Sequence, residues 1–144
     1  MALVATFGIK SVGACDGAAP AWRTMSESLV ILRSDEGVTH HLAVKIAIKP
    51  AQRRAGFQHI CSKWVQVWGV LFVFPTSQRS MFHMRNVRDD LDIAFIAEDG
   101  RILELKKMSR ELGSVSSRSY RAAQPYRYAL EVVAGRLSAL GLGE

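Results

Sequence analysis

The sequence has few cysteines and no long apolar run, and both shortages exclude whole classes of protein. Its two cysteines, Cys15 and Cys61, show no metal-ligand spacing and no disulfide framework, so we expect two free thiols. No stretch approaches the ~18 consecutive apolar residues of a membrane helix. The sequence also lacks internal repeats, a glycine-rich phosphate loop, a Ser-His-Asp order and a paired-cysteine motif, so no familiar enzyme class is indicated.

The length and the charge together indicate one small basic domain. A chain of 144 residues suits a single domain, because a domain near that size buries roughly 70% of its unfolded surface. The formal charge is +6, from 19 basic and 13 acidic residues, and the basic residues are scattered along the chain. A scattered charge predicts a basic surface and does not point to a specific nucleic-acid partner.

The N-terminal residues differ in composition from the rest of the chain. Residues 1–25 are rich in alanine and glycine, and residues 12–15 (VGAC) faintly resemble a bacterial lipoprotein cleavage box. No basic residue precedes the apolar stretch and Lys10 interrupts it, which makes a poor signal peptide. We expect a flexible or signal-like extension over 1–25 and a single β-domain over 26–144. A cytoplasmic and an exported location both stay open.

Alternation of apolar and polar residues predicts strands in much of the remainder. Residues 38–47 alternate cleanly, and the turn cluster at 34–37 makes them one arm of a hairpin. Asp99-Gly100, between two apolar runs, predicts a second hairpin. Residues 126–133 also alternate, and residues 49–56 are typical of a short helix. We therefore expect a mainly β fold, a compact antiparallel β-sandwich or barrel-like domain with one or two short helices.

The stretch from Phe82 to Ile96 is the most informative one. Its first part resembles an apolar strand, and the apolar residues at 91, 93 and 95 predict a second strand that places Asp92 on the opposite face. A buried polar group needs partners, because unpaired burial costs roughly 1–3 kcal/mol. We expect Asp92 to be ionised and hydrogen-bonded to Arg85, Asn86 or nearby backbone amides.

Aromatic residues suggest a further alternative. Trp64 and Trp68 begin a strand-like run ahead of the apolar strand at 70–74. Because bases stack on aromatic side chains, weak nucleic-acid binding through the basic surface is an alternative function. It would rest on Trp64, Trp68, Tyr120, Tyr126 and Tyr128. The sequence contains no recognition helix and no paired-aromatic strand motif, so we expect no specific nucleic-acid partner.

Several short motifs follow one another in a distinctive order between residues 42 and 142. They are VKIA at 44–47, GFQ at 56–58, GVLFVF at 69–74, FHMRNV at 82–87, DLDIAFI at 90–96, DGRI at 99–102, LE at 130–131, AG at 134–135 and LG at 140–141. Their order resembles the uncharacterised bacterial and archaeal family called domain of unknown function 192. The resemblance implies a compact β-sandwich or barrel-like fold, often behind an export signal, and no known reaction.

The sequence departs from that family pattern at several positions. His83 stands where the pattern has Trp, Val87 where it has Thr, and Asp90 where it has Pro. No Arg follows residues 56–58 at the place where the family usually carries one. An active site that depended on that Arg and Thr would be incomplete in this chain.

The leading hypothesis is a β-domain that binds a small polar or anionic ligand, or a protein partner, without catalysis of its own. Arg85 would supply a forked donor, and Asn86 both a donor and an acceptor. The candidate ligand-binding residues are His83, Arg85, Asn86, Asp92, Tyr120 and Glu131.

A hydrolase-like or metal-dependent enzyme is the alternative hypothesis. His83 could act as a base oriented by Asp90 or Asp92, or a metal could bind among these residues. No nucleophile stands at a diagnostic spacing, so we assign no catalytic residue, no metal ligand and no cofactor. The expected partner is an unknown small molecule or protein, with no membrane span, and the oligomeric state is not predicted.

Overall fold

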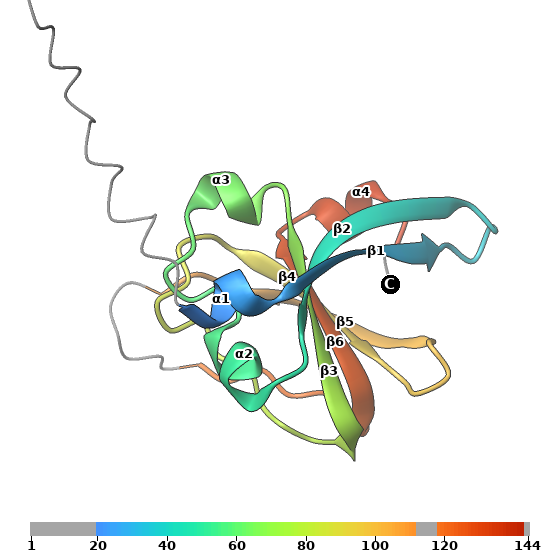
Figure 1. The fold of residues 1–144 in the computed structure, drawn as a ribbon. Helices are drawn as coiled ribbons and strands as arrows, with labels where there is room; N and C mark the ends of the chain where they lie inside the picture. Colours follow the sequence, from blue (N-terminus) through green and yellow to red (C-terminus); the bar gives the residue numbers. More distant parts are fainter. Residues whose placement is uncertain (1–19, 112–117, 143–144) are drawn as a thin grey trace, which may run out of the picture.

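The computed structural model describes residues 20–111 and 118–142 as one six-stranded sheet with short helices around it (Figure 1). The strands lie in the order β1-β2-β3-β6-β4-β5, and only β2 and β3 are parallel neighbours among them. The elements are α1 (Pro20–Thr24), β1 (Ser26–Arg33), β2 (Thr39–Ala47), α2 (Pro50–Ala55), α3 (Ser62–Val65), β3 (Gly69–Gln78), β4 (Leu91–Ile96), β5 (Ile102–Met108), β6 (Tyr126–Val133) and α4 (Arg136–Ala139).

The mainly β expectation is confirmed, and the sheet is a single open one rather than a barrel. The parallel β2–β3 pair departs from the all-antiparallel arrangement that we expected. The chain between these strands carries α2 and α3, and a crossover of this kind allows a parallel pair where a tight turn would impose an antiparallel one. The described residues form four short helices, α1 to α4, where one or two were expected.

Both faces of the sheet are covered, and each has its own core. The aromatic face is centred on Phe57, Phe72, Phe95 and Tyr126, together with Trp22 of α1. The aliphatic face is centred on Leu42, Val44, Leu130, Val132 and Leu137. As a result, all six residues of β4 are buried, although the alternation at 91, 93 and 95 indicated only one apolar face.

Several local predictions are confirmed. β1 and β2 form an antiparallel hairpin, and β4 and β5 form another around the turn at Asp99-Gly100. The Oδ1 atom of Asp99 accepts a hydrogen bond from the backbone N–H of Arg101 at 3.0 Å, which stabilises this turn. The expected helix after β2 is α2, and Gly56 ends it with a φ of 44°. The expected late strand is β6.

Other local predictions are wrong. Residues 64–68 do not begin a strand, because Trp64 lies in α3 and Trp68 precedes β3. Phe82 does not belong to a regular strand either: it forms an isolated antiparallel bridge with Tyr120, with N–H···O distances of 2.9 and 2.8 Å. Cys61 is disulfide-bonded, so the expectation of a free thiol is wrong at that position, and Cys15 lies outside the described residues. Disulfide pairing depends on spatial proximity, which sequence spacing alone does not reveal.

The folded region begins before residue 26. Residues 1–19 of the expected extension lie outside the described part of the chain, whereas Pro20–Thr24 form α1. Trp22 and Met25 are buried, and the Trp22 ring packs against Phe57 with centroids 5.5 Å apart. In the described residues no helix has both the length and the apolar character to cross a membrane.

Candidate ligand-binding pocket

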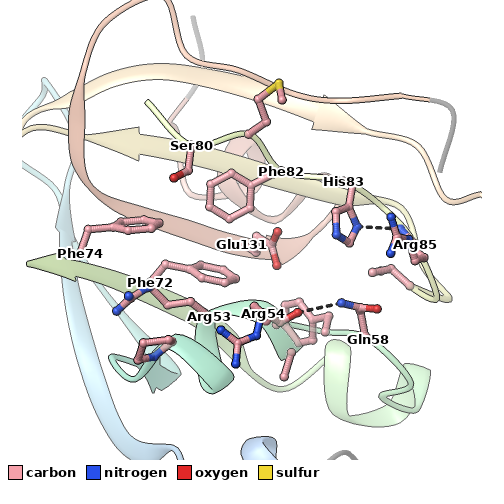
Figure 2. A pocket seen from close by; sticks show the side chains of 16 residues that line it. Arg53, Arg54, Gln58, Phe72, Phe74, Ser80, Phe82, His83, Arg85 and Glu131 are labelled. Atoms are coloured by element: carbon pink, nitrogen blue, oxygen red, sulfur yellow. Dashed lines mark hydrogen bonds between the residues drawn. The ribbon is translucent and has the colours of Figure 1, made fainter. Parts of the chain in front are cut away.

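A pocket of about 430 Å³ opens on the aromatic face, between α2 and the segment that joins β3 to β4 (Figure 2). This volume lies within the usual range for small-molecule sites. Phe72 and Phe74 of β3 and Phe82 form aromatic walls, and Glu131 of β6 lies between the walls. Phe72 and Phe82 meet edge to face, with ring centroids 5.0 Å apart, so this part of the wall is preorganised.

Glu131 is a buried carboxyl group at the inner end of the pocket. Glu131 is only 4% exposed, and no described residue donates a hydrogen bond to its carboxyl oxygens. Burial raises the pKa of Glu131 to about 8, because removal from water penalises the charged form. The carboxyl group is therefore mainly protonated at neutral pH and can donate a hydrogen bond as well as accept one.

The strand register explains why no cation offsets this burial. On the aromatic face Glu131 pairs with Val70 on one side and Ile93 on the other, and both are fully buried. Lys45 and Lys106 come next in the same row, about 10 Å from Glu131 at two strand spacings. Each lysine is already in an ion pair, Lys45 with Glu27 at 2.6 Å and Lys106 with Glu104 at 3.1 Å.

Gly56 allows the end of α2 to approach the inner end of the pocket. A Cβ atom at this position would lie 3.2 Å from Cζ of Phe72 and 3.7 Å from Oε2 of Glu131. Its φ of 44° also lies in a region that L side chains rarely adopt. A glycine here thus satisfies both the turn after α2 and the close contact with the Phe72 ring.

Arginines surround the mouth of the pocket. The Arg53 guanidinium lies 5.3 Å from the centre of the Phe74 ring and donates to the carbonyl oxygens of Ile48 and Val73. The guanidinium groups of Arg54 and Arg85 have no hydrogen bond or ion pair with any described residue. Both groups are therefore available to a ligand.

His83 and Arg85 lie together on the other side of the mouth (Figure 2). The Nδ1 atom of His83 accepts a hydrogen bond from the backbone N–H of Arg85 at 3.2 Å. Burial, and after it the charge of Arg85, lower the pKa of His83 below its usual value of 6.5. His83 is therefore mainly neutral at pH 7, and the fixed positive charge of the mouth comes from the arginines.

Three of the predicted ligand-binding residues, His83, Arg85 and Glu131, line this pocket. Asn86 lies beside it: its side-chain amide donates to Oε1 of Gln58, a lining residue, at 3.3 Å. Tyr120 is not part of the lining, and its hydroxyl oxygen accepts a hydrogen bond from the backbone N–H of Ser109.

Asp92 lies on the opposite side of the sheet. It shares the aliphatic face with Ala94 and Ile96, and its Oδ2 atom accepts a hydrogen bond from the backbone N–H of Gly135 at 2.8 Å. The predicted bond to a backbone amide is confirmed, whereas the predicted cluster with Arg85 and Asn86 is wrong. Because Glu131 is in register with Ile93, the neighbouring Asp92 must face away from the pocket.

The residues of the enzyme hypothesis are also separated. Oδ1 of Asp90 accepts from the backbone N–H of Arg110 at 2.7 Å, and no hydrogen bond within the described chain joins His83 to Asp90 or Asp92. Among the described residues no group of three or more His, Cys, Asp or Glu side chains could hold a metal ion. Asp92 therefore does not orient His83 as a base in this structure.

The aromatic residues of the nucleic-acid alternative do not share one surface. Trp64 is exposed on α3, while Tyr126 is fully buried in the aromatic core. Tyr128 packs on the aliphatic face instead. Stacking on a single strand would need these rings on one accessible surface.

Sequence reasoning missed the aromatic walls, the arginines of α2 and the role of Gly56. The sequence indicates Phe72 only as part of an apolar strand, and Arg53 and Arg54 only as part of a short helix with a share of the scattered basic charge. The order of the sequence motifs was the one signal that could have indicated this pocket. The pocket joins GFQ through Gly56, GVLFVF through Phe72, FHMRNV through Arg85 and LE through Glu131.

The fold and this site define a small mainly β domain with a pocket around a buried carboxyl group. The chain belongs to the family domain of unknown function 192, described as "Uncharacterized ACR", whose profile matches residues 30–144. No curated protein matches the chain.

Two solved structures are similar to the chain over most of its length. One, from Sinorhizobium meliloti 1021 and described as a candidate transcription regulator, is 29% identical with a TM-score of 0.73, over 83% of this chain and 89% of that one. The other, a protein of unknown function from Novosphingobium aromaticivorans DSM 12444, is 22% identical with a TM-score of 0.70, over 83% and 81% of the two chains. The second similarity concerns the fold alone.

Proposed function

We propose that this domain binds a small polar or anionic ligand in the pocket beside Glu131 and does not transform it. The observation that carries the proposal is the convergence of separate motifs on one cavity. Gly56, Phe72, Arg85 and Glu131 come from distant parts of the sequence, and all of them line the same space. Their chemistry is that of a binding site, with apolar walls, a few polar groups and fixed positive charge at the entrance.

The arrangement of charge supports an anionic or polar ligand over a cationic one. The guanidinium groups of Arg54 and Arg85 form no hydrogen bond or ion pair with described residues. Each can therefore offer two parallel N–H donors to a ligand. The field of three arginines at one entrance also raises the local concentration of anions.

The same geometry supports binding without catalysis. The Nδ1 atom of His83 accepts its hydrogen bond from a backbone amide, and no described hydroxyl or thiol is hydrogen-bonded to the imidazole. A nucleophile needs such a base within hydrogen-bond reach.

A thermal-shift screen of polar metabolites tests this proposal. Compounds that raise the melting temperature of the wild type should lose most of that effect in Arg85→Ala. The matched control is Arg101→Ala, because Arg101 is exposed and pairs with Asp99 in the β4–β5 turn. Hits that persist equally in Arg85→Ala and Arg101→Ala would show that this pocket is not the binding site.

A further inference from the structure

The pocket combines a carboxyl group inside with arginines at its mouth, so two opposite kinds of ligand must be compared. A cation would pair with an ionised Glu131 but would have to pass Arg53, Arg54 and Arg85. An anion would pair with the arginines but would be repelled by Glu131 if that group were ionised. The protonation of Glu131 therefore decides which ligand fits.

The surroundings of Glu131 favour the protonated form. Its two neighbours across the strands, Val70 and Ile93, are fully buried aliphatic side chains, and the Phe72 ring lies beside it. No described residue donates a hydrogen bond to its oxygens. A neutral carboxyl group in such a site does not attract a cation, and its O–H can donate to an acceptor on the ligand.

The arginines at the mouth and the aromatic walls indicate the chemistry of the other parts of the ligand. Arg54 and Arg85 offer planar forks that match a carboxylate. Phe72 and Phe82 present rings that pack best against a flat apolar body. Arg53 is already held by the Phe74 ring and by backbone carbonyls, so it adds charge rather than a free fork.

We propose that the ligand is a small carboxylate with a flat apolar body, and that it binds when Glu131 carries a proton. Arg54 and Arg85 hold the carboxylate of the ligand, Phe72 and Phe82 contact its body, and the Glu131 hydroxyl faces its inner end. This inference rests on the proposed function, because it assigns a ligand class to the same pocket.

Other charged groups around Glu131 do not account for a change of binding between pH 7 and pH 9. Arginine keeps its charge over this range, and the lowered pKa of His83 places its titration below it. Tyr126, on β6, is hydrogen-bonded to the carbonyl oxygen of Ser80, and burial raises its pKa above 10.0. Lys45 on β2 and Lys106 on β5 are held in ion pairs with Glu27 and Glu104, two strands from Glu131.

Calorimetric titration with three probes of one shape tests the ligand class. Benzoate, benzamide and benzylamine share a flat ring and carry a negative, a neutral and a positive group. The wild type should bind benzoate most tightly and benzylamine least, and Arg54→Ala and Arg85→Ala should each weaken benzoate binding at least several-fold. If benzylamine binds as tightly as benzoate, or if benzoate does not bind at millimolar concentration, the inference is wrong.

The pH dependence tests the role of the proton. Benzoate affinity should fall roughly tenfold between pH 7 and pH 9, because the protonated fraction of Glu131 falls by that factor around a pKa of about 8. Glu131→Gln keeps the shape and a donor, so it should bind benzoate with no such fall. An equal fall in both proteins would overturn the proton requirement.

A second measurement covers the case in which Glu131→Gln does not fold. Wild-type titrations at pH 8.5 in triethanolamine and in Tris, which have different ionisation enthalpies, should show uptake of about three quarters of a proton per benzoate bound. No uptake would contradict the inference. If metabolite hits depend on Arg85 but none is a carboxylate, this inference fails and the proposed function stands; if no hit depends on Arg85, both fail.

Discussion

Asp92 and Glu131 lie on neighbouring strands, yet their carboxyl groups face opposite sides of the sheet. Asp92 is in register with Val132, and Glu131 with Ile93, so the alternation of each strand turns the two carboxyl groups apart. Both residues are buried, at 5% and 4% exposure. Asp92 accepts a backbone hydrogen bond from Gly135, whereas Glu131 has no donor among the described residues and faces the pocket. The first residue therefore connects two segments of the fold, and the second is available to a ligand.

The free energy of unfolding should fall as the pH rises from about 4.5 towards 8 because of Glu131. Burial raises its pKa from 4.5 to about 8, so over this range the folded protein keeps a proton that the unfolded chain releases. The stabilisation from this group is complete below about 4.5 and is lost as the pH rises through about 8. One proton corresponds to a slope of about 1.4 kcal/mol per pH unit.

Glu131→Gln is the matched variant for this prediction, because it cannot titrate and keeps the side-chain shape. Urea melts of both proteins at pH 5, 6, 7 and 8 measure the free energy of unfolding. The value for Glu131→Gln should increase relative to that of the wild type as the pH rises. A difference that stays constant with pH would mean that Glu131 ionises in the folded state much as it does in the unfolded chain.

Asp92→Ala should destabilise the fold by about 2 kcal/mol. The substitution removes the carboxyl acceptor of the hydrogen bond from the N–H of Gly135, and a hydrogen bond to a charged group contributes roughly 1.5–3 kcal/mol. Asp92→Asn should cost less, because its amide oxygen can still accept this bond. The control is Glu36→Ala, an exposed position in the β1–β2 turn, which should stay within about ±0.5 kcal/mol. Equal urea midpoints for Asp92→Ala and Glu36→Ala would refute the structural role of Asp92.

Gly56→Ala should cost about 1–2 kcal/mol and should also weaken ligand binding in the pocket. The new Cβ would be strained by the φ of 44° and would crowd Cζ of Phe72 at 3.2 Å. Gly100→Ala separates these two effects, because Gly100 has a φ of 90° but no atom within 4 Å of the added Cβ. Urea melts should therefore show a larger loss for Gly56→Ala. If Gly56→Ala loses no more stability than Gly100→Ala, backbone strain alone explains the loss, and the contact with Phe72 does not contribute.

His83 should titrate below pH 6.5 in a proton NMR experiment. Burial is the main reason for its lowered pKa, and the charge of Arg85 is the second. Arg85→Ala should therefore raise the midpoint, and Arg101→Ala should leave it unchanged, since Arg101 lies in the β4–β5 turn. A midpoint that Arg85→Ala does not move would show that the two side chains do not interact in solution.

Part of the site could be predicted because its chemistry is visible in single residues. His83, Arg85 and Glu131 were identified as polar candidates, and all three line the pocket. Phe72 and Gly56 were not identified, because a buried ring and a helix-ending glycine look the same in a sequence whether or not a cavity lies beside them.

The sequence by itself determined several local elements of the structure. The Asp99-Gly100 turn, the alternation of β2 and β6 and the extent of α2 depend on turn chemistry and on periods of two or 3.6 residues. The same alternation correctly separated Asp92 from Leu91 and Ile93.

Only the tertiary structure decided which segments became neighbours. β6 lies between β3 and β4, and this position gives Glu131 the apolar neighbours Val70 and Ile93 that raise its pKa. It also places Asp92 across the sheet from Arg85, against the sequence-based expectation. A strand's alternation assigns each side chain to one of two faces. Which distant strand completes that face depends on the packing of the whole chain, because strand order is set by long-range pairing.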